Sequence, residues 1–196
     1  MANLRRRILW HKQAHQWHWI SAALVLGGIL IFSATGITLN HAAQIEGSPT
    51  IMTRSAMLPA ALLGELRAPI SPSIAQWIDA HLEVAIVGHE VEWSDDEAYV
   101  SMPRAGVDTW LSIDRTTGAI EYEATDRGWI AFFNDLHKGR NTGWVWSLFM
   151  DVIAVACLIF SISGFFLLQL QAKHRAATWP VLGAGAAVLV LIIVLH

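Results

Sequence analysis

The sequence has little cysteine and little charge. Its single cysteine, Cys157, lies in an apolar run. One cysteine excludes an internal disulfide, a four-cysteine metal cluster and covalent haem attachment through a C-x-x-C-H motif within one chain. Charged residues make up 15% of the chain, and no basic stripe lies outside the flanks of the apolar runs, so nucleic acid is not an expected partner. No nucleophile–base constellation or phosphate-binding loop is present.

Hydrophobic residues are abundant instead, at 54% of the chain with a mean hydropathy of +0.43. An ordinary soluble domain is less apolar, so the composition predicts a membrane protein in contact with lipid. Three apolar runs, 17–40, 143–170 and 179–195, predict transmembrane helices, because a helix rises about 1.5 Å per residue and must cross about 30 Å. Many of the ten tryptophans lie at the ends of these runs, as interfacial belts do.

The positive residues predict the orientation of these spans. Basic residues flank the first run on its N-terminal side and fill the loop between the second and third runs: Arg5, Arg6, Arg7, Lys12, Lys173 and Arg175. The positive-inside rule then puts segment 1–16 and loop 171–178 in the cytoplasm and residues 41–142 outside. A cleaved signal peptide is the alternative for the first run, but the run is too long and no clean small-residue cleavage site follows it.

The outer region, 41–142, reads as a small α+β domain between the first and second spans. Residues 42–70 are expected to be loop and short helix, and Ser71-Pro72 predicts the start of an amphipathic helix. Four strand-like runs follow: Glu83 to Trp93, Ala98 to Met102, Val107 to Ile113 and Ala119 to Glu123. The turn 114–118 joins the last two as a hairpin. The predicted fold is therefore a mainly α-helical membrane protein with three transmembrane helices and one small α+β domain.

Histidines bracket the first two spans. His15 and His18 precede the first span and His41 closes it, while His137 precedes the second span and His174 follows it. His18 and His41 are about 35 Å apart in a helix, so they cannot ligate one iron. Antiparallel packing would pair His41 with His137 at the outer face, and His15 or His18 with His174 at the inner face. Such pairs are what one or two b-type haems require as axial ligands.

Other readings of these residues remain open. A histidine near a span end is often simply interfacial, and His41, His137 and Asp135 could instead bind zinc or copper, although without tight spacing. Asp151, the one acid in the second span, could bond a ligand histidine, a haem propionate or a proton path, or serve helix packing. The small residues at 183–187 suit close packing of the third helix, within the chain or between protomers.

Four elements of the sequence resemble the PepSY-associated transmembrane proteins. They are Gly36 with Asn40-His41, the segment Ser112-Ile113-Asp114-Arg115-Thr116-Thr117-Gly118, the element Asp135-Leu136-His137-Lys138-Gly139-Arg140, and Ser163-Gly164-Phe165. The resemblance implies a bacterial inner-membrane protein with a periplasmic PepSY-like domain and with b-type haem bound by transmembrane histidines. It implies His41 and His137 as outer ligands, and His15 or His18 with His174 as inner ligands. Asn40 and Arg140 belong to these motifs and would support the site, together with Asp151.

The expected function is that of an oxidoreductase that passes electrons to ferric iron or a ferric chelate for uptake. The chain departs from larger members of the family, since it has three spans rather than four or more and lacks a recognisable flavin or nicotinamide domain. The electron donor is therefore unknown, and a homodimer could complete the haem pockets. The alternatives are a haem-free, membrane-anchored binding or regulatory module and an accessory subunit of a membrane complex.

Overall fold

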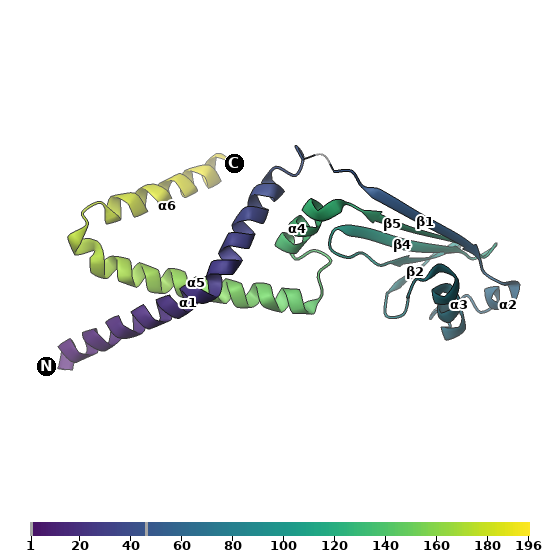
Figure 1. Ribbon diagram of the computed structural model, residues 1–196, viewed down its shortest axis with the longest axis horizontal. Helices are drawn as coiled ribbons and strands as arrows, with labels where there is room; N and C mark the ends of the chain where they lie inside the picture. Colours follow the sequence, from purple (N-terminus) through teal and green to yellow (C-terminus); the bar gives the residue numbers. More distant parts are fainter. Residues whose placement is uncertain (1, 46) are drawn as a thin grey trace. The chain divides into compact units, whose positions relative to one another are not determined.

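The computed structural model describes the backbone of residues 2–45 and 47–196 and the side chains of residues 9–45 and 47–196. The side chains of Arg5, Arg6 and Arg7, which support the predicted orientation, lie outside this described part. Figure 1 shows the elements in chain order. They are α1 (Ala2–Asn40), β1 (Thr50–Met57), α2 (Ala60–Leu63), α3 (Pro72–Leu82), β2 (Val91–Trp93), β3 (Glu97–Ser101), β4 (Val107–Asp114), β5 (Ala119–Asp126), α4 (Gly128–Lys138), α5 (Trp144–Gln171), a 3₁₀ helix (Ala172–His174) and α6 (Thr178–Leu195).

Three helical segments are long and apolar enough to cross a membrane: Leu9–Asn40, Trp144–His174 and Thr178–Leu195. The chain therefore fits a multi-pass membrane protein that is mainly helical and carries one antiparallel sheet. None of the residues of α6 is buried within the chain, although the Trp179 ring lies 6.2 Å from that of Phe165 on α5.

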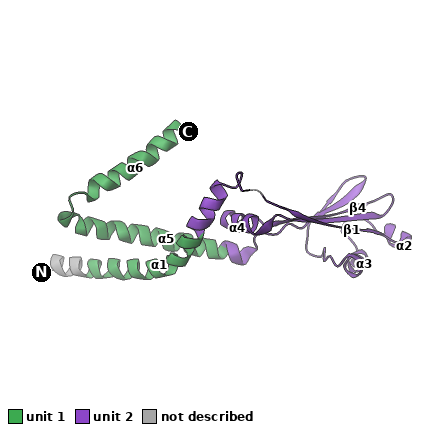
Figure 2. Cartoon of the chain, turned by 45° about the horizontal axis from the view of Figure 1, so that its top comes forward, with its two compact units in different colours: residues 1–31, 148–196 green, residues 32–147 purple. Residues whose placement is uncertain are grey.

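The chain divides into two compact units, coloured separately in Figure 2. The first contains residues 1–31 and 148–196, which form most of the apolar helices. The second contains residues 32–147. The second unit thus includes the last turns of α1 and the first turn of α5 as well as the region 41–142.

The second unit is built on a five-stranded antiparallel sheet with the order β1-β5-β4-β3-β2. Alternate residues of the central strands, including Leu111, Ile113 and Ile120, are almost completely buried in one core with Ile74 and Ile78 of α3. This period of two, set against the helical period of α3, is the pattern of a helix packed on one face of a sheet. The predicted sheet and its covering helix are therefore present.

The start of α3 follows from its first residues. The hydroxyl of Ser71 accepts a hydrogen bond from the amide of Ile74 at 3.3 Å, and Pro72 occupies the first turn. A side-chain oxygen satisfies an otherwise unpaired amide there, and proline supplies a helical φ where no amide is needed.

Two parts of the predicted secondary structure are wrong. Residues 50–57, expected within a region of loop and short helix, form the edge strand β1, which pairs with β5 along its whole length. Its side chains are mostly exposed, so no apolar alternation marks it in the sequence. Conversely, of the run 83–93 only Val91–Trp93 is a strand. Val84 and Ile86 are buried loop residues, so they produce a strand-like alternation without a ladder.

The turn between β4 and β5 is organised by the carboxylate of Asp114. Its Oδ1 accepts hydrogen bonds from the amides of Thr116, at 2.8 Å, and Thr117, at 2.7 Å. Gly118 completes the turn at φ +77°, where an added Cβ would lie 3.3 Å from the carbonyl oxygen of Leu58. The bonds from the Thr117 amide and hydroxyl, with that from the Thr116 amide, lower the pKa of Asp114 below its ordinary value of 3.8.

This turn predicts a contribution to stability that depends on pH. Because the folded-state pKa of Asp114 is lowered, the ionised carboxylate stabilises the fold above pH 3.8, and this stability is lost as the pH falls through the folded-state pKa. Asp114→Asn should therefore lower the unfolding temperature of the detergent-solubilised chain at pH 7, and the difference from the wild type should close in more acidic buffer. Asp95→Asn, at an exposed position, is the control. A difference that stays constant down to pH 3 would contradict the role of the ionised turn.

The packing of α1 on α5 yields a second prediction, because two adjacent glycines differ in their surroundings. An added Cβ at Gly28 would lie 2.9 Å from Cγ2 of Ile153, whereas one at Gly27 would have nothing within 4 Å. Gly28→Ala should destabilise the α1–α5 contact by about 1–3 kcal/mol, as overpacking does. Gly27→Ala should be neutral or slightly stabilising, because alanine favours helix. Unfolding in mixed micelles measures both, and equal effects would contradict the close approach at Gly28.

Candidate functional site

His18 of α1 is held against α5 within the first unit. Its Nδ1 lies 3.2 Å from the carbonyl oxygen of Phe160 and 3.1 Å from the hydroxyl oxygen of Ser163. The Ser163 hydroxyl itself donates to the Phe160 carbonyl at 3.0 Å, so its oxygen is free to accept a proton from Nδ1. The imidazole stacks on the Phe160 ring, with centroids 4.6 Å apart and an interplanar angle of 16°.

Glycine at position 164 allows this close approach. An added Cβ on Gly164 would lie 3.1 Å from Cε1 of His18, which is closer than most real contacts of a Cβ atom. We call the group formed by His18, Phe160, Ser163 and Gly164 the His18 site.

His137 of α4 is held against the end of α1 within the second unit. Its Nδ1 lies 2.8 Å from the hydroxyl oxygen of Thr35, and that hydroxyl donates to the carbonyl of Phe32 at 3.3 Å. The Phe32 ring meets the imidazole edge-on, with centroids 5.3 Å apart. An added Cβ on Gly36 would lie 3.4 Å from Cε1 of His137. We call the group formed by His137, Phe32, Thr35 and Gly36 the His137 site.

The two sites share a five-residue sequence pattern that the hydropathy and histidine spacing of the chain do not indicate. Residues 32–36 are Phe-Ser-Ala-Thr-Gly and residues 160–164 are Phe-Ser-Ile-Ser-Gly. Positions 1, 4 and 5 of this segment lie on one face of a helix, so each copy offers an aromatic ring, a hydroxyl and a position without a side chain to a facing histidine. The repeated pattern Phe-Ser-x-Ser/Thr-Gly in two membrane spans is the signal that could have identified these positions from the sequence.

The outer pair predicted from the sequence is arranged differently. His41 is exposed, and its Nδ1 lies 3.0 Å from the carbonyl oxygen of Ile37 in its own helix. Within the described part of the chain, no contact joins His41 to His137. The partner of His137 is Thr35, almost two helical turns before His41.

The inner histidines are also separate. His15 is exposed and its ring lies 4.6 Å from that of His11, while His174 is exposed in the 3₁₀ helix after α5. Neither His15 nor His18 contacts His174 among the residues that the structure describes. Of the five predicted haem ligands, His18 and His137 are the two held by a neighbouring helix.

The three supporting residues have different surroundings. Asn40 and Asp151 are exposed on α1 and α5. Arg140, just after α4, lies 3.4 Å from Oδ1 of Asp108 and 3.6 Å from Oδ1 of Asp135. Arg140 therefore belongs to a polar network rather than to a histidine site.

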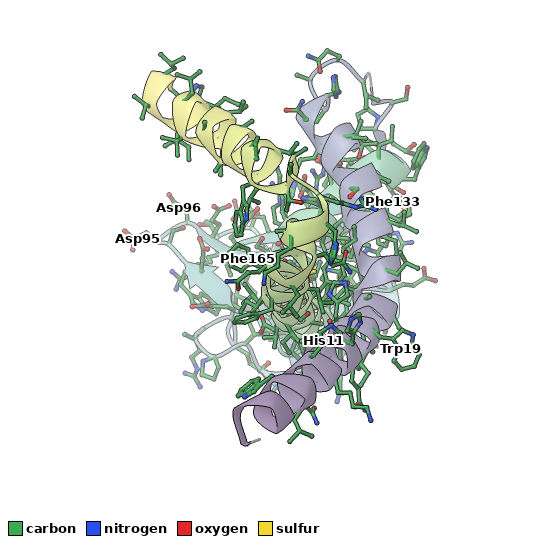
Figure 3. The ribbon with its side chains drawn as sticks, turned by 90° about the vertical axis from the view of Figure 1, so that its left-hand side faces the viewer. His11, Trp19, Asp95, Asp96, Phe133 and Phe165 are labelled. Carbon is green, nitrogen blue, oxygen red and sulfur yellow. The ribbon has the colours of Figure 1, made fainter. Side chains whose placement is uncertain are left out.

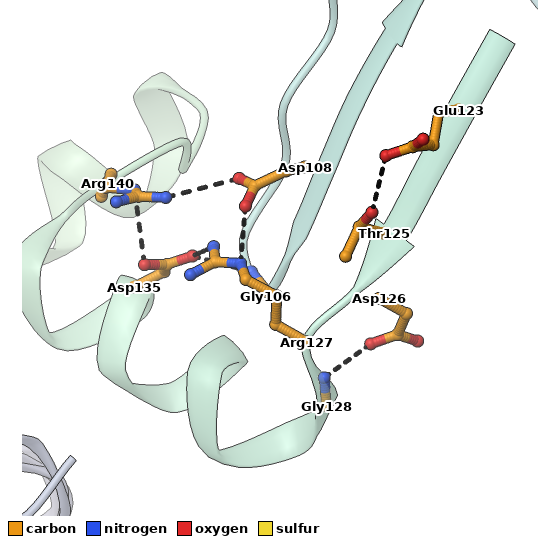
Figure 4. A network of polar contacts seen from close by, with 9 residues as sticks. All are labelled: Gly106, Asp108, Glu123, Thr125, Asp126, Arg127, Gly128, Asp135 and Arg140. Atoms are coloured by element: carbon orange, nitrogen blue, oxygen red, sulfur yellow. Dashed lines mark hydrogen bonds and ion pairs between the residues drawn. The ribbon is translucent and has the colours of Figure 1, made fainter. Parts of the chain in front are cut away.

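That network, drawn in Figure 4, joins α4 to the ends of β4 and β5. Oδ2 of Asp135, a residue only 3% exposed, accepts from the Gly106 amide at 2.9 Å and from Arg127 at 2.5 Å. Arg127 also pairs with Asp108 at 2.9 Å. The network engages Asp135 fully, which argues against its use in a metal site with His41 and His137. Among the described residues, no three histidine, cysteine or acidic side chains are grouped closely enough to hold a metal ion.

A groove of about 1140 Å³ lies between α1 and α5 in the first unit. Trp10, Trp17 and Phe166 supply aromatic walls, and Ser163 of the His18 site also lines it. His11, labelled in Figure 3, contributes a polar group to the same groove. The groove is mainly apolar with a few polar groups at its edge, which is the general character of small-molecule sites.

Comparison with known proteins identifies the family of the chain. The family model described as PepSY_TM-like matches residues 9–196. No curated protein and no solved structure was found to match the chain. Because the family match covers nearly the whole sequence, the chain belongs to the PepSY_TM-like family of transmembrane proteins.

Proposed function

We propose that this chain is a b-type haem protein of the bacterial inner membrane that transfers electrons to ferric iron or a ferric chelate at the periplasmic face. The observation that carries the proposal is the pair of histidine sites, in which the same five-residue segment holds an imidazole through Nδ1. Haem, when bound, would supply one-electron redox chemistry. The positive residues flanking the spans support a cytoplasmic N-terminus and a periplasmic sheet domain.

The residues present fit axial ligation by single histidines. When a hydroxyl or carbonyl accepts the Nδ1 proton, the lone pair of the imidazole is left on Nε2, the nitrogen that would bind iron. Ligating histidines usually have such a partner, which fixes both the tautomer and the ring orientation. His18 and His137 meet this requirement through Ser163 and Thr35. The apolar groove beside Ser163 could accommodate the macrocycle and exclude water from it.

Each site offers one imidazole from this chain. A bis-histidine centre would therefore need a second ligand, from a second copy of the chain in a homodimer or from His15, His41 or His174 after rearrangement.

The test is the oxidised-minus-reduced visible spectrum and the haem content of the full-length protein, purified in detergent from cells supplied with haem. His18→Ala and His137→Ala should each remove haem, because each deletes a positioned ligand. His41→Ala and His174→Ala are the matched controls and should retain more haem. Loss of haem in the two controls as well as in His137→Ala would favour the pairs predicted from the sequence, and wild-type protein without haem would overturn the proposal.

The hydroxyl partners allow a finer test. Thr35→Val removes the hydroxyl beside Nδ1 of His137, and Ser163→Ala removes one of the two acceptors beside Nδ1 of His18, leaving the Phe160 carbonyl. Both variants leave the histidines in place, and the effect of Ser163→Ala should be the smaller. Loss of such a partner typically lowers metal affinity by about 10–100-fold, and we expect haem affinity to fall by a similar factor. Ser33→Ala and Ser161→Ala, at the exposed second positions of the two segments, are the controls. Haem titration measures all four, and equal affinities would show that the hydroxyls do not orient the ligands.

A haem-free binding or regulatory module is the second candidate, favoured by the free face of the sheet. Helix α3 covers one face, while the other presents the stacked rings of Tyr99 and Trp110, with centroids 6.1 Å apart. Two hollows of about 380 and 310 Å³ on this face share Glu121. Wild-type protein that lacks haem but retains its fold would favour this function.

A further inference from the structure

Helix α4 has an unusual balance of contacts. Its buried residues are the polar Asn134 and Asp135, whereas Trp129, Phe132 and Phe133 are exposed and Ile130 and Leu136 are half-buried. The N-cap residue Arg127 makes no side-chain capping bond, and the Asp126 carboxylate accepts from the Gly128 amide at 2.8 Å. Since no apolar side chain of the helix is fully buried, polar contacts contribute strongly to its position.

Those polar contacts lie on two sides of the helix. Residues two positions apart in a helix differ by about 200° around its axis, so Asp135 and His137 project in nearly opposite directions. Asp135 meets Arg127 and the Gly106 amide at the end of the sheet, while His137 meets Thr35 of α1. Asn134 adds a second contact with α1, since its Oδ1 accepts from the Thr38 hydroxyl at 3.0 Å.

The contacts of Asp135 with Arg127 and the Gly106 amide oppose movement of α4 relative to the sheet. A buried carboxylate that loses its cationic partners pays a large desolvation cost, so Asp135 favours the one helix position at which Arg127 and Arg140 both reach it. The backbone adds a second restraint. An added Cβ on Gly106 would lie 2.9 Å from Cα of Phe132, so α4 rests directly on this glycine.

We propose that Asp135 is a positioning residue for His137: it accepts from the Gly106 amide and pairs with Arg127 and Arg140, which both pair with Asp108 of β4, and these contacts fix α4 on the sheet so that it presents the imidazole to Thr35. The functional meaning of this arrangement rests on the proposed role of His137 as a haem ligand. The geometric claim is separate, because it concerns the distance between α4 and α1.

Cross-linking of the full-length protein measures that distance without haem. In a Cys157→Ala background, Thr35→Cys and His137→Cys place two thiols across the contact, and a bifunctional methanethiosulfonate with a two-carbon spacer joins them. Adding Asp135→Asn, which removes the charge but keeps the shape, should slow cross-linking by at least about fivefold, the equivalent of roughly 1 kcal/mol.

Two controls separate positioning from loss of fold. Asp126→Asn changes a neighbouring carboxylate, which accepts from the amide of Gly128 at the start of α4 but lies outside the ion pairs of Asp135. It should leave the cross-linking rate within about twofold of the parent. A second thiol pair, Thr53→Cys with Glu123→Cys, lies directly opposite on β1 and β5 and should cross-link equally with and without Asp135→Asn.

The outcomes distinguish this inference from the proposed function. Unchanged cross-linking of the 35–137 pair in Asp135→Asn, or equal slowing of the 53–123 pair, would overturn the positioning role. In protein that retains His137, Asp135→Asn should also shift the midpoint potential of bound haem, while Asp126→Asn should not. If the wild-type protein binds no haem, but cross-linking of the 35–137 pair depends on Asp135, the haem proposal would end and the positioning role would remain.

Discussion

A buried carboxylate surrounded by cationic and amide donors joins α4 to the sheet in the second unit. Asp135 is buried on a helix that has no fully buried apolar side chain, so its pairing with Arg127 and Arg140 contributes strongly to the position of the helix. Those arginines also pair with Asp108 of the sheet. Electrostatics within the domain therefore determines where a histidine meets a membrane helix, a task that hydrophobic packing usually performs.

The two histidine sites have the same local arrangement, although different helices supply their groups. At one, α1 supplies the histidine and α5 supplies the aromatic ring, hydroxyl and glycine. At the other, α4 supplies the histidine and α1 supplies those three groups. The hydroxyl in each case also lies within hydrogen-bond distance of a carbonyl in its own helix, and when it donates to that carbonyl its oxygen accepts from the imidazole. In that arrangement the proton of the ring is on Nδ1.

Much of the fold could be predicted from the sequence because its signals are local. Hydropathy identifies the three candidate spans, the Ser71-Pro72 pair marks the start of α3, and the Asp114 to Gly118 segment marks a turn. Strand β1 could not be predicted in this way, since an exposed edge strand has no apolar alternation. The sequence also could not predict that His41 and His137 lie apart. Hydropathy gives the height of a residue in a membrane, but not the direction in which the residue faces around the helix axis. The repeated segment at 32–36 and 160–164 carried that directional information.

Helix α6 illustrates a different consequence of a membrane environment. None of its residues is buried within the chain, and its ring contact through Trp179 lies at its very start. Its stability in a bilayer therefore comes from the transfer of an apolar helix from water to lipid, which requires no partner of matching shape. Within the chain, many apolar residues could meet this requirement in α6, whereas α5 is restricted at position 164, where a single added methyl group would meet an imidazole.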